Sequence, residues 1–209
     1  MKLQSAVLIT ALATACSTLA GVAQTPAAPP QTPAASAATQ PKTVGQRKEN
    51  QQDRIGQGVA SGQLTAGETK SLEGREAGLN AETRDMRADD SGHLTAADRA
   101  KLNRQQNRLS NSIYTDKHNL AQQRQGAGVI GQRGENQQDR IANGIKNGTL
   151  SPAETARLEK QQQGTNREVA GMREANGGKL TAADKKVLNQ QQNKNSRRIY
   201  KTKHDGRGR

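Results

Sequence analysis

Large apolar residues recur along this chain at the intervals of amphipathic helices, separated by polar stretches. Two lie one turn apart in residues 46–60, three lie seven apart in residues 65–88, and three more follow from residue 95. The pattern predicts three helices, whose buried face holds these residues together with a few apolar side chains of the turns and the end. The predicted core is Ile55, Val59, Leu64, Leu72, Leu79, Met86, Leu94, Leu102, Leu109, Ile113, Tyr114 and Leu120.

Four short segments, which we call hinges, share one sequence motif. It consists of a small residue, Gly, any residue, Leu and then Thr or Ser, with an acidic residue three positions after the Thr or Ser. They occupy residues 61–68, 91–98, 147–154 and 177–184. Glycine suits the left-handed residue that ends a helix, and a hydroxyl followed by an acid three places later is a capping box that begins the next helix. The hinges therefore predict helix–turn–helix connections.

The chain is internally duplicated at a spacing of 86 residues. Between residues 45–123 and 131–209, 38 of 79 aligned pairs are identical. The predicted fold is all-α, with two tandem repeats of about three helices each, at 45–130 and 131–209. Thr165 replaces Leu79 and Asn195 replaces Leu109 in the second repeat, which predicts that its core is less well packed.

The first 44 residues predict a targeting segment and a spacer. Lys2, an apolar run and a small-x-small site at Gly21–Val22–Ala23 are typical of a secretory signal peptide, residues 1–23. A transmembrane anchor and a lipoprotein anchored through Cys16 are the alternatives. Residues 24–44 hold five of the six prolines, a composition that favours a disordered linker. We expect a periplasmic or secreted protein.

Composition argues against an enzyme. The sequence has no Phe or Trp, two Tyr and one Cys, and it contains no phosphate-binding glycine loop, nucleophile elbow or paired-carboxylate cleft. His118 and His204 occupy equivalent repeat positions, where a cation at a helix C-terminus is the simpler interpretation than a metal ligand. Tyr114 and Tyr200 are expected to pack at the bundle ends. We therefore predict no catalytic residues and no bound cofactor.

The second hinge has the spacing of an EF-hand loop, which leaves calcium binding as an alternative. Asp89, Ser91 and Asp98 would be ligands, and Gly92 occupies the sixth place. Arg87 stands at the first place, where a calcium loop needs an acid. A glycine that ends one helix and a capping box that begins the next explain all four hinges. We therefore predict no metal site and keep calcium binding as the less favoured hypothesis.

From residue 45 to the end, the chain resembles a group of uncharacterised exported bacterial helical-repeat proteins with degenerate EF-hand-like hinges. The resemblance rests on two sequence motifs of the first repeat. One runs from Arg54–Ile55 to Glu68, and the other, at the end of the repeat, consists of Ser110, Ile113–Tyr114 and Lys117–His118. Both recur, at Arg140–Ile141 to Glu154 and at Ser196, Ile199–Tyr200 and Lys203–His204. The resemblance implies export and helical repeats but no activity.

Positive charge is concentrated at the C-terminal end. The chain carries a formal charge of +13, and residues 194–209 hold seven cations against Asp205, whereas residues 108–123 hold two against Asp116. The candidate polyanion-binding residues are Lys194, Arg197, Arg198, Lys201, Lys203, Arg207 and Arg209. Non-specific contact with an anionic envelope polymer or an envelope protein is expected, without base-specific readout of nucleic acid, because no aromatic platform accompanies the cations. The alternative is a solvated basic end that only aids solubility.

Overall fold

The computed structural model describes residues 42–123, 126 and 128–208. In these residues the protein is all-helical, as predicted, and no strand occurs. The predicted signal peptide, most of the linker, Cys16 and Arg209 lie outside the described residues. The helices are α1 (Val44–Ala60), α2 (Ala66–Asp89), α3 (Ala96–Lys117), α4 (Val129–Lys146), α5 (Pro152–Ala175) and α6 (Ala182–Lys203).

Each of the four hinges begins its helix with the predicted capping box. The hydroxyls of Thr65, Thr95, Ser151 and Thr181 are the N-caps and accept from the backbone N–H three residues on, while the acid at that position accepts from the cap's own N–H. Each helix therefore starts one residue after the predicted Thr or Ser. A capping box between Thr43 and Gln46 also begins α1, two residues earlier than the apolar pattern predicted.

The hinges are of two kinds, although their sequences are alike. In the α1–α2 hinge Leu64 is buried and its N–H donates to the Gly58 carbonyl oxygen at 3.0 Å. A Cβ at Gly58 would lie 2.6 Å from Leu64 Cδ1, so glycine at this position lets the leucine fold back over α1. The α4–α5 hinge repeats this arrangement. In the α2–α3 and α5–α6 hinges the leucine is only half-buried, and two successive residues have positive φ.

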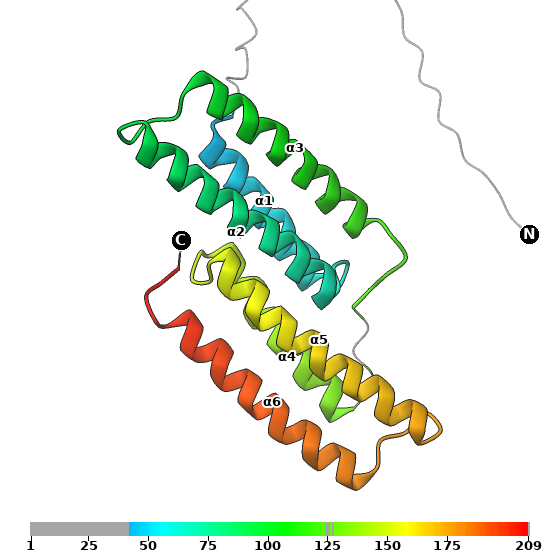
Figure 1. Ribbon diagram of the computed structural model, residues 1–209. Coiled ribbons are helices and arrows are strands. Elements are labelled where there is room, and N and C mark those ends of the chain that lie inside the picture. Colours follow the sequence, from blue (N-terminus) through cyan, green and yellow to red (C-terminus); the bar gives the residue numbers. More distant parts are fainter. Residues whose placement is uncertain (1–41, 124–125, 127, 209) are drawn as a thin grey trace, which may run out of the picture. The chain divides into compact units, whose positions relative to one another are not determined.

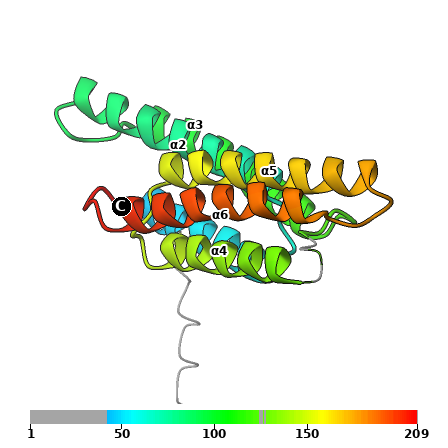
Figure 2. The same cartoon turned by 90° about the horizontal axis from the view of Figure 1, so that it is seen from below.

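The two halves pack through equivalent helices. α1 lies beside α4 and α2 beside α5, while α3 and α6 lie on the outer flanks (Figures 1 and 2). Gly56 and Ala142, which are 86 residues apart, meet where α1 crosses α4: a Cβ at Gly56 would lie 3.3 Å from the Ala142 carbonyl oxygen. An interface in which equivalent surfaces meet is isologous, the kind found in twofold dimers. Residues 41–209 consequently form one compact unit.

A single apolar core runs through both halves. It joins buried side chains of both repeats, namely Ile55, Val59, Leu64, Leu72, Leu109, Ile113, Ile141, Ala142, Ile145, Leu150, Leu158 and Ile199, with Leu79 packed against it. Four predicted core residues are corrected. Leu120 is fully exposed because it lies beyond the end of α3, and Tyr114 is 61 % exposed because it lies about 100° around the helix from the buried Ile113. Leu94 and Met86 are only half-buried.

Glutamine side chains tie each flanking helix to the first helix of its half. Gln51 Nε2 donates to the Gln106 carbonyl oxygen at 2.7 Å, and Gln106 Nε2 donates back to the Val44 carbonyl oxygen at 2.9 Å. The second half has the same two hydrogen bonds: Gln137 Nε2 donates to the Gln192 carbonyl oxygen and Gln192 Nε2 donates to the Ile130 carbonyl oxygen, both at 2.8 Å. These amides are buried, so each hydrogen bond also satisfies a group that water does not reach.

The two polar replacements in the second repeat face each other. Asn195 Nδ2 donates to Thr165 Oγ1 at 3.1 Å in the contact between α5 and α6, at the place where Leu79 and Leu109 lie in the first repeat. The pair therefore satisfies its own polar groups. Because a buried hydrogen bond contributes about 1 kcal/mol and an apolar leucine pair more, we still expect this contact to be the weaker one.

We predict strong coupling between these two positions. Thr165→Leu alone should lower the free energy of unfolding by about 1–3 kcal/mol, because it leaves the Asn195 amide without its acceptor. Thr165→Leu with Asn195→Leu restores the pair of the first repeat and should raise stability above the starting protein. Urea unfolding of both single variants and the double variant measures this, and additive effects would contradict the pairing.

Candidate functional site

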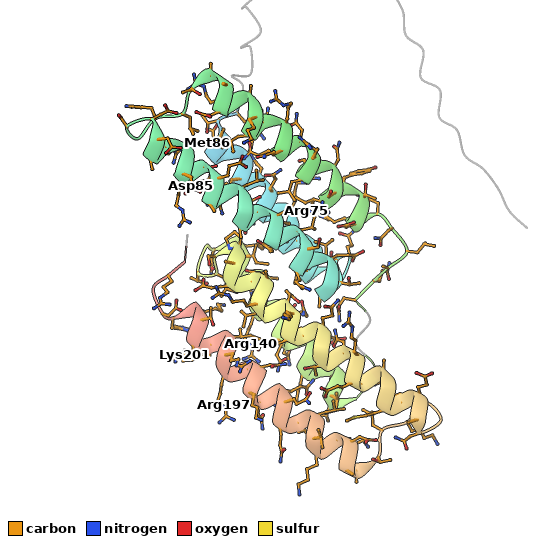
Figure 3. All side chains as sticks on the ribbon, in the orientation of Figure 1. Arg75, Asp85, Met86, Arg140, Arg197 and Lys201 are labelled. Carbon is orange, nitrogen blue, oxygen red and sulfur yellow. The ribbon has the colours of Figure 1, made fainter. Side chains whose placement is uncertain are left out.

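Four of the predicted cations lie together on the outer face of α6. At 3.6 residues per turn, Lys194, Arg197, Arg198 and Lys201 fall within an arc of about 100°. All four are exposed, and Arg197 and Lys201 extend away from the bundle (Figure 3). The opposite side of α6 carries Leu188, Gln192, Asn195 and Ile199, which are buried. Burial of that face fixes the rotation of the helix and so turns the cations outward.

These four side chains form no ion pair with an acid in the part of the chain that the structure describes. No salt bridge or side-chain hydrogen bond joins them to any residue that the structure describes. The equivalent positions on α3 are Arg108, Asn111, Ser112 and Thr115. The first repeat thus carries one cation where the second carries four, on the same scaffold.

The other three predicted residues do not join this face. Lys203 is half-buried, and its Nζ donates to the Arg140 carbonyl oxygen at 3.2 Å, which ties the end of α6 to α4. Arg207 follows α6 and lines a separate cavity beside α2. Arg209 lies outside the described residues. The candidate face, which we call the α6 basic face, therefore consists of Lys194, Arg197, Arg198 and Lys201.

His118 and His204 are the C-caps of α3 and α6, at the helix ends where the sequence placed them. Tyr114 stacks on His118 with ring centroids 4.1 Å apart, and Tyr200 stacks on His204 at 4.2 Å. Each His Nδ1 also lies 2.7 Å from the carbonyl oxygen of its tyrosine. The two tyrosine rings lie at the helix ends, as expected, but they stack on the C-cap histidines and remain largely exposed to solvent.

In the hinge at residues 91–98, Asp98 forms the capping box of α3. Asp98 Oδ2 accepts from the Thr95 N–H at 2.9 Å, and hydrogen bonds from Thr95 lower the pKa of Asp98. The pKa of Asp90 is raised by desolvation and by the neighbouring carboxylates of Asp98 and Asp89. Across residues 42–123, 126 and 128–208, no group of three Asp, Glu, His or Cys side chains is arranged to hold a metal ion. Of the candidate calcium ligands Asp89, Ser91 and Asp98, Asp98 is thus engaged in the capping box of α3.

The structure reveals buried carboxyl groups that the apolar pattern did not predict. Glu73 on α2 and Glu159 on α5 are equivalent residues, and neither has any exposed surface. Gln52 Nε2 donates to Glu73 Oε2 at 3.0 Å, and Gln138 Nε2 donates to Glu159 Oε2 at 3.1 Å. The two acids lie on the helices that join the halves. The one sequence signal for them is that both acids and both glutamines are identical in the two repeats.

Burial raises the pKa of Glu159 from its ordinary value of 4.5 to about 8. The hydrogen bond from Gln138 acts in the opposite direction, and the charge of Glu73 raises the pKa further. A carboxyl group that is neutral at pH 7 can donate a hydrogen bond as well as accept one. Glu159 is therefore best described as a protonated part of the core.

None of the helices in the described ranges has both the length and the apolar character needed to cross a lipid bilayer. Comparison with protein-family models, with curated proteins and with solved structures finds no match to this chain.

We predict that the protein loses stability as the pH rises from about 4.5 to about 8. Folded Glu159 keeps a proton that the unfolded chain releases in this range, so the free energy of unfolding should fall by up to about 1.4 kcal/mol per pH unit. Glu159→Gln should remove most of this dependence, because the neutral amide can still accept from Gln138. Urea unfolding at pH 5 and pH 8 measures it, with exposed Glu174→Gln as the matched control. An unchanged pH slope in Glu159→Gln would contradict the assignment.

Proposed function

We propose that this protein is a non-enzymatic, exported protein of the cell envelope that binds anionic polymers through the α6 basic face. The observation that carries the proposal is the set of four exposed, unpartnered cations on one side of a helix whose other side is anchored in the core. A rigid helix holds the four charges in one row. A polyanion that lies along this row gains several contacts at once without ordering a flexible segment.

The duplicated scaffold does not require the positive charge of this face. The first repeat builds an equivalent flanking helix with a single cation at the four positions. Arg197 and Lys201 also repel each other one turn apart, at a cost of a few tenths of a kcal/mol. A bound polyanion removes that repulsion and releases counterions, which favours association at low salt.

The contact is non-specific in this proposal. Arg and Lys bind phosphate, sulfate and carboxylate groups, and the two aromatic rings near this end of α6 belong to the stack of Tyr200 on His204. Acidic polysaccharide, lipopolysaccharide and extracellular nucleic acid share the required charge. Polymer charge density and salt concentration should therefore determine affinity, and sequence or sugar identity should not.

The α6 basic face can be tested with residues that the first repeat already uses. The variant Arg197→Asn, Arg198→Ser and Lys201→Thr places the α3 residues on α6 and should elute from heparin at clearly lower salt. With duplex DNA, the slope of log K against log salt should become shallower by about 3, one unit for each lost contact. Circular dichroism checks that α6 remains helical, since the new residues have lower helix propensity.

The reverse variant, Asn111→Arg with Thr115→Lys on α3, is the matched control. It should increase heparin retention, because it builds two of the missing charges on the equivalent helix. Equal retention of the α6 variant and the starting protein would show that this face does not bind polyanions.

Export is the second part of the proposal and rests on the N-terminal pattern, which lies outside the described residues. The exported protein should begin at Gln24, and its intact mass tests this directly. A diacylglyceryl group on Cys16 would contradict release and would place the protein on a membrane.

A further inference from the structure

A cavity of about 660 Å³ lies where α1 and α2 of the first half meet residues of the second half, and none of the residues of the α6 basic face lines it. The start of α1, the second part of α2, the start of α5 and the segment after α6 contribute to its lining. Its volume is in the range of small-ligand sites. Four cations line it, and we call it the cationic cavity: Lys48 on α1, Arg84 and Arg87 on α2, and Arg207 after α6.

The charged groups of these four side chains form no salt bridge and no hydrogen bond with another residue of the described ranges. The backbone N–H of Arg207 donates to Asp205 Oδ1 at 3.0 Å, which leaves its guanidinium group unpaired within those ranges. Arg84 and Arg87 are three residues apart on one helix, where like charges repel. Two carboxyl groups, those of Glu49 and Glu76, also line the cavity, so the cations exceed the acids by two. An occupant with two or more negative charges would balance this excess.

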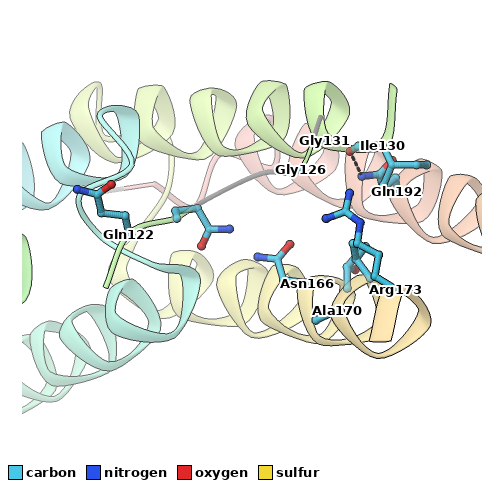
Figure 4. Close-up of a pocket in the computed structure, with 11 residues that line it drawn as sticks. Gln122, Gly126, Ile130, Gly131, Asn166, Ala170, Arg173 and Gln192 are labelled. Atoms are coloured by element: carbon cyan, nitrogen blue, oxygen red, sulfur yellow. Dashed lines mark hydrogen bonds between the residues drawn. The ribbon is translucent and has the colours of Figure 1, made fainter. Parts of the chain in front are cut away.

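The second half contains the equivalent cavity without this charge. It measures about 280 Å³ and is lined by Ile130, Gly131, Asn166, Ala170 and Arg173 among others (Figure 4). Arg173 is equivalent to Arg87 and is the one cation among its described lining residues.

The other three cations of the first cavity have small neutral residues at the equivalent positions. Lys48 corresponds to Gly134, Arg84 to Ala170 and Arg207 to Ala121. The helix packing that shapes both cavities is shared, so packing does not require these cations. Their presence in one copy alone indicates a role for the charge itself.

We propose that the cationic cavity binds a phosphate-bearing ligand, with Arg84 and Arg87 holding the phosphate oxygens. A guanidinium group presents parallel N–H donors that match two oxygens of a phosphate. A phosphate monoester or a polyphosphate carries the double charge that the excess of two cations requires, whereas a single carboxylate does not. This site does not depend on the α6 basic face, and either proposal can fail while the other stands.

Calorimetric titration of the full chain with tripolyphosphate at physiological salt, where the non-specific contact of the α6 basic face is weakened, tests the proposal. Saturable binding with a stoichiometry of one is expected. Arg84→Ala with Arg87→Gln should weaken it at least tenfold, and the alanine at position 84 copies Ala170 of the second half. Thermal unfolding shows whether this variant remains folded, and it should, because the substitution removes a pair of like charges.

Two control variants and one control ligand separate the alternatives. Arg173→Gln in the second cavity and the triple variant of the α6 basic face should each bind tripolyphosphate as the starting protein does. Citrate should bind at least tenfold more weakly than tripolyphosphate. Equal binding by the Arg84 and Arg87 variant, equal losses in all variants, equal affinity for citrate, or no saturable binding would each overturn the proposal.

Discussion

Each half of this protein depends on the other half to bury its apolar side chains. A single repeat has few large apolar residues and no Phe or Trp, so three helices alone cannot enclose a core of their own. The contact of α1 with α4 and of α2 with α5 solves this by joining the two apolar faces into one core. The close approach at Gly56 and Ala142 shows how small residues allow it.

The same contact explains why polar residues are buried at its centre. Glu73 and Glu159 lie on the helices that meet, and Gln52 and Gln138 satisfy one oxygen of each acid. A raised pKa lets Glu159 remain neutral there, which avoids the large cost of burying a charge. Buried polar groups of this kind contribute little net stability, but they disfavour any packing that leaves them unsatisfied.

Core and surface have diverged differently in the two repeats. The hydrogen bond between Gln51 and Gln106 occurs again between Gln137 and Gln192, because it holds the flanking helix of each half in place. Exposed positions carry no such constraint. The second repeat carries four cations on α6 where the first carries one on α3, and three of the four cations of the cationic cavity belong to the first repeat, so equivalent scaffolds present different charges. Both proposals of function arise from these differences.

The sequence by itself determined the helices and the starts of those that a capping box begins; α4, which has no side-chain cap, begins at Val129, two residues before the predicted start of its repeat. Capping boxes such as Thr65 with Glu68 act over three residues, so a local pattern suffices to place the start of a helix to within a residue or two. The excess of positive charge on α6 could also be predicted from the sequence, because it needs only a count of charged residues. The sequence did not show which of these cations share one exposed face. Lys194, Arg197, Arg198 and Lys201 group together without Lys203 because the core covers the other side of α6.

Only the tertiary structure decided which residues are buried where the halves meet. A heptad pattern marks Leu72 and Leu79 but treats Glu73 as exposed, since a charged residue is seldom buried unless a partner from another helix satisfies it. The partner of Glu73 is Gln52, which lies 21 residues away in the sequence. The helix that packs over this part of α2 belongs to the other repeat. The same reason applies to the Thr165–Asn195 pair and to the cationic cavity, whose residues come from α1, α2 and the segment after α6.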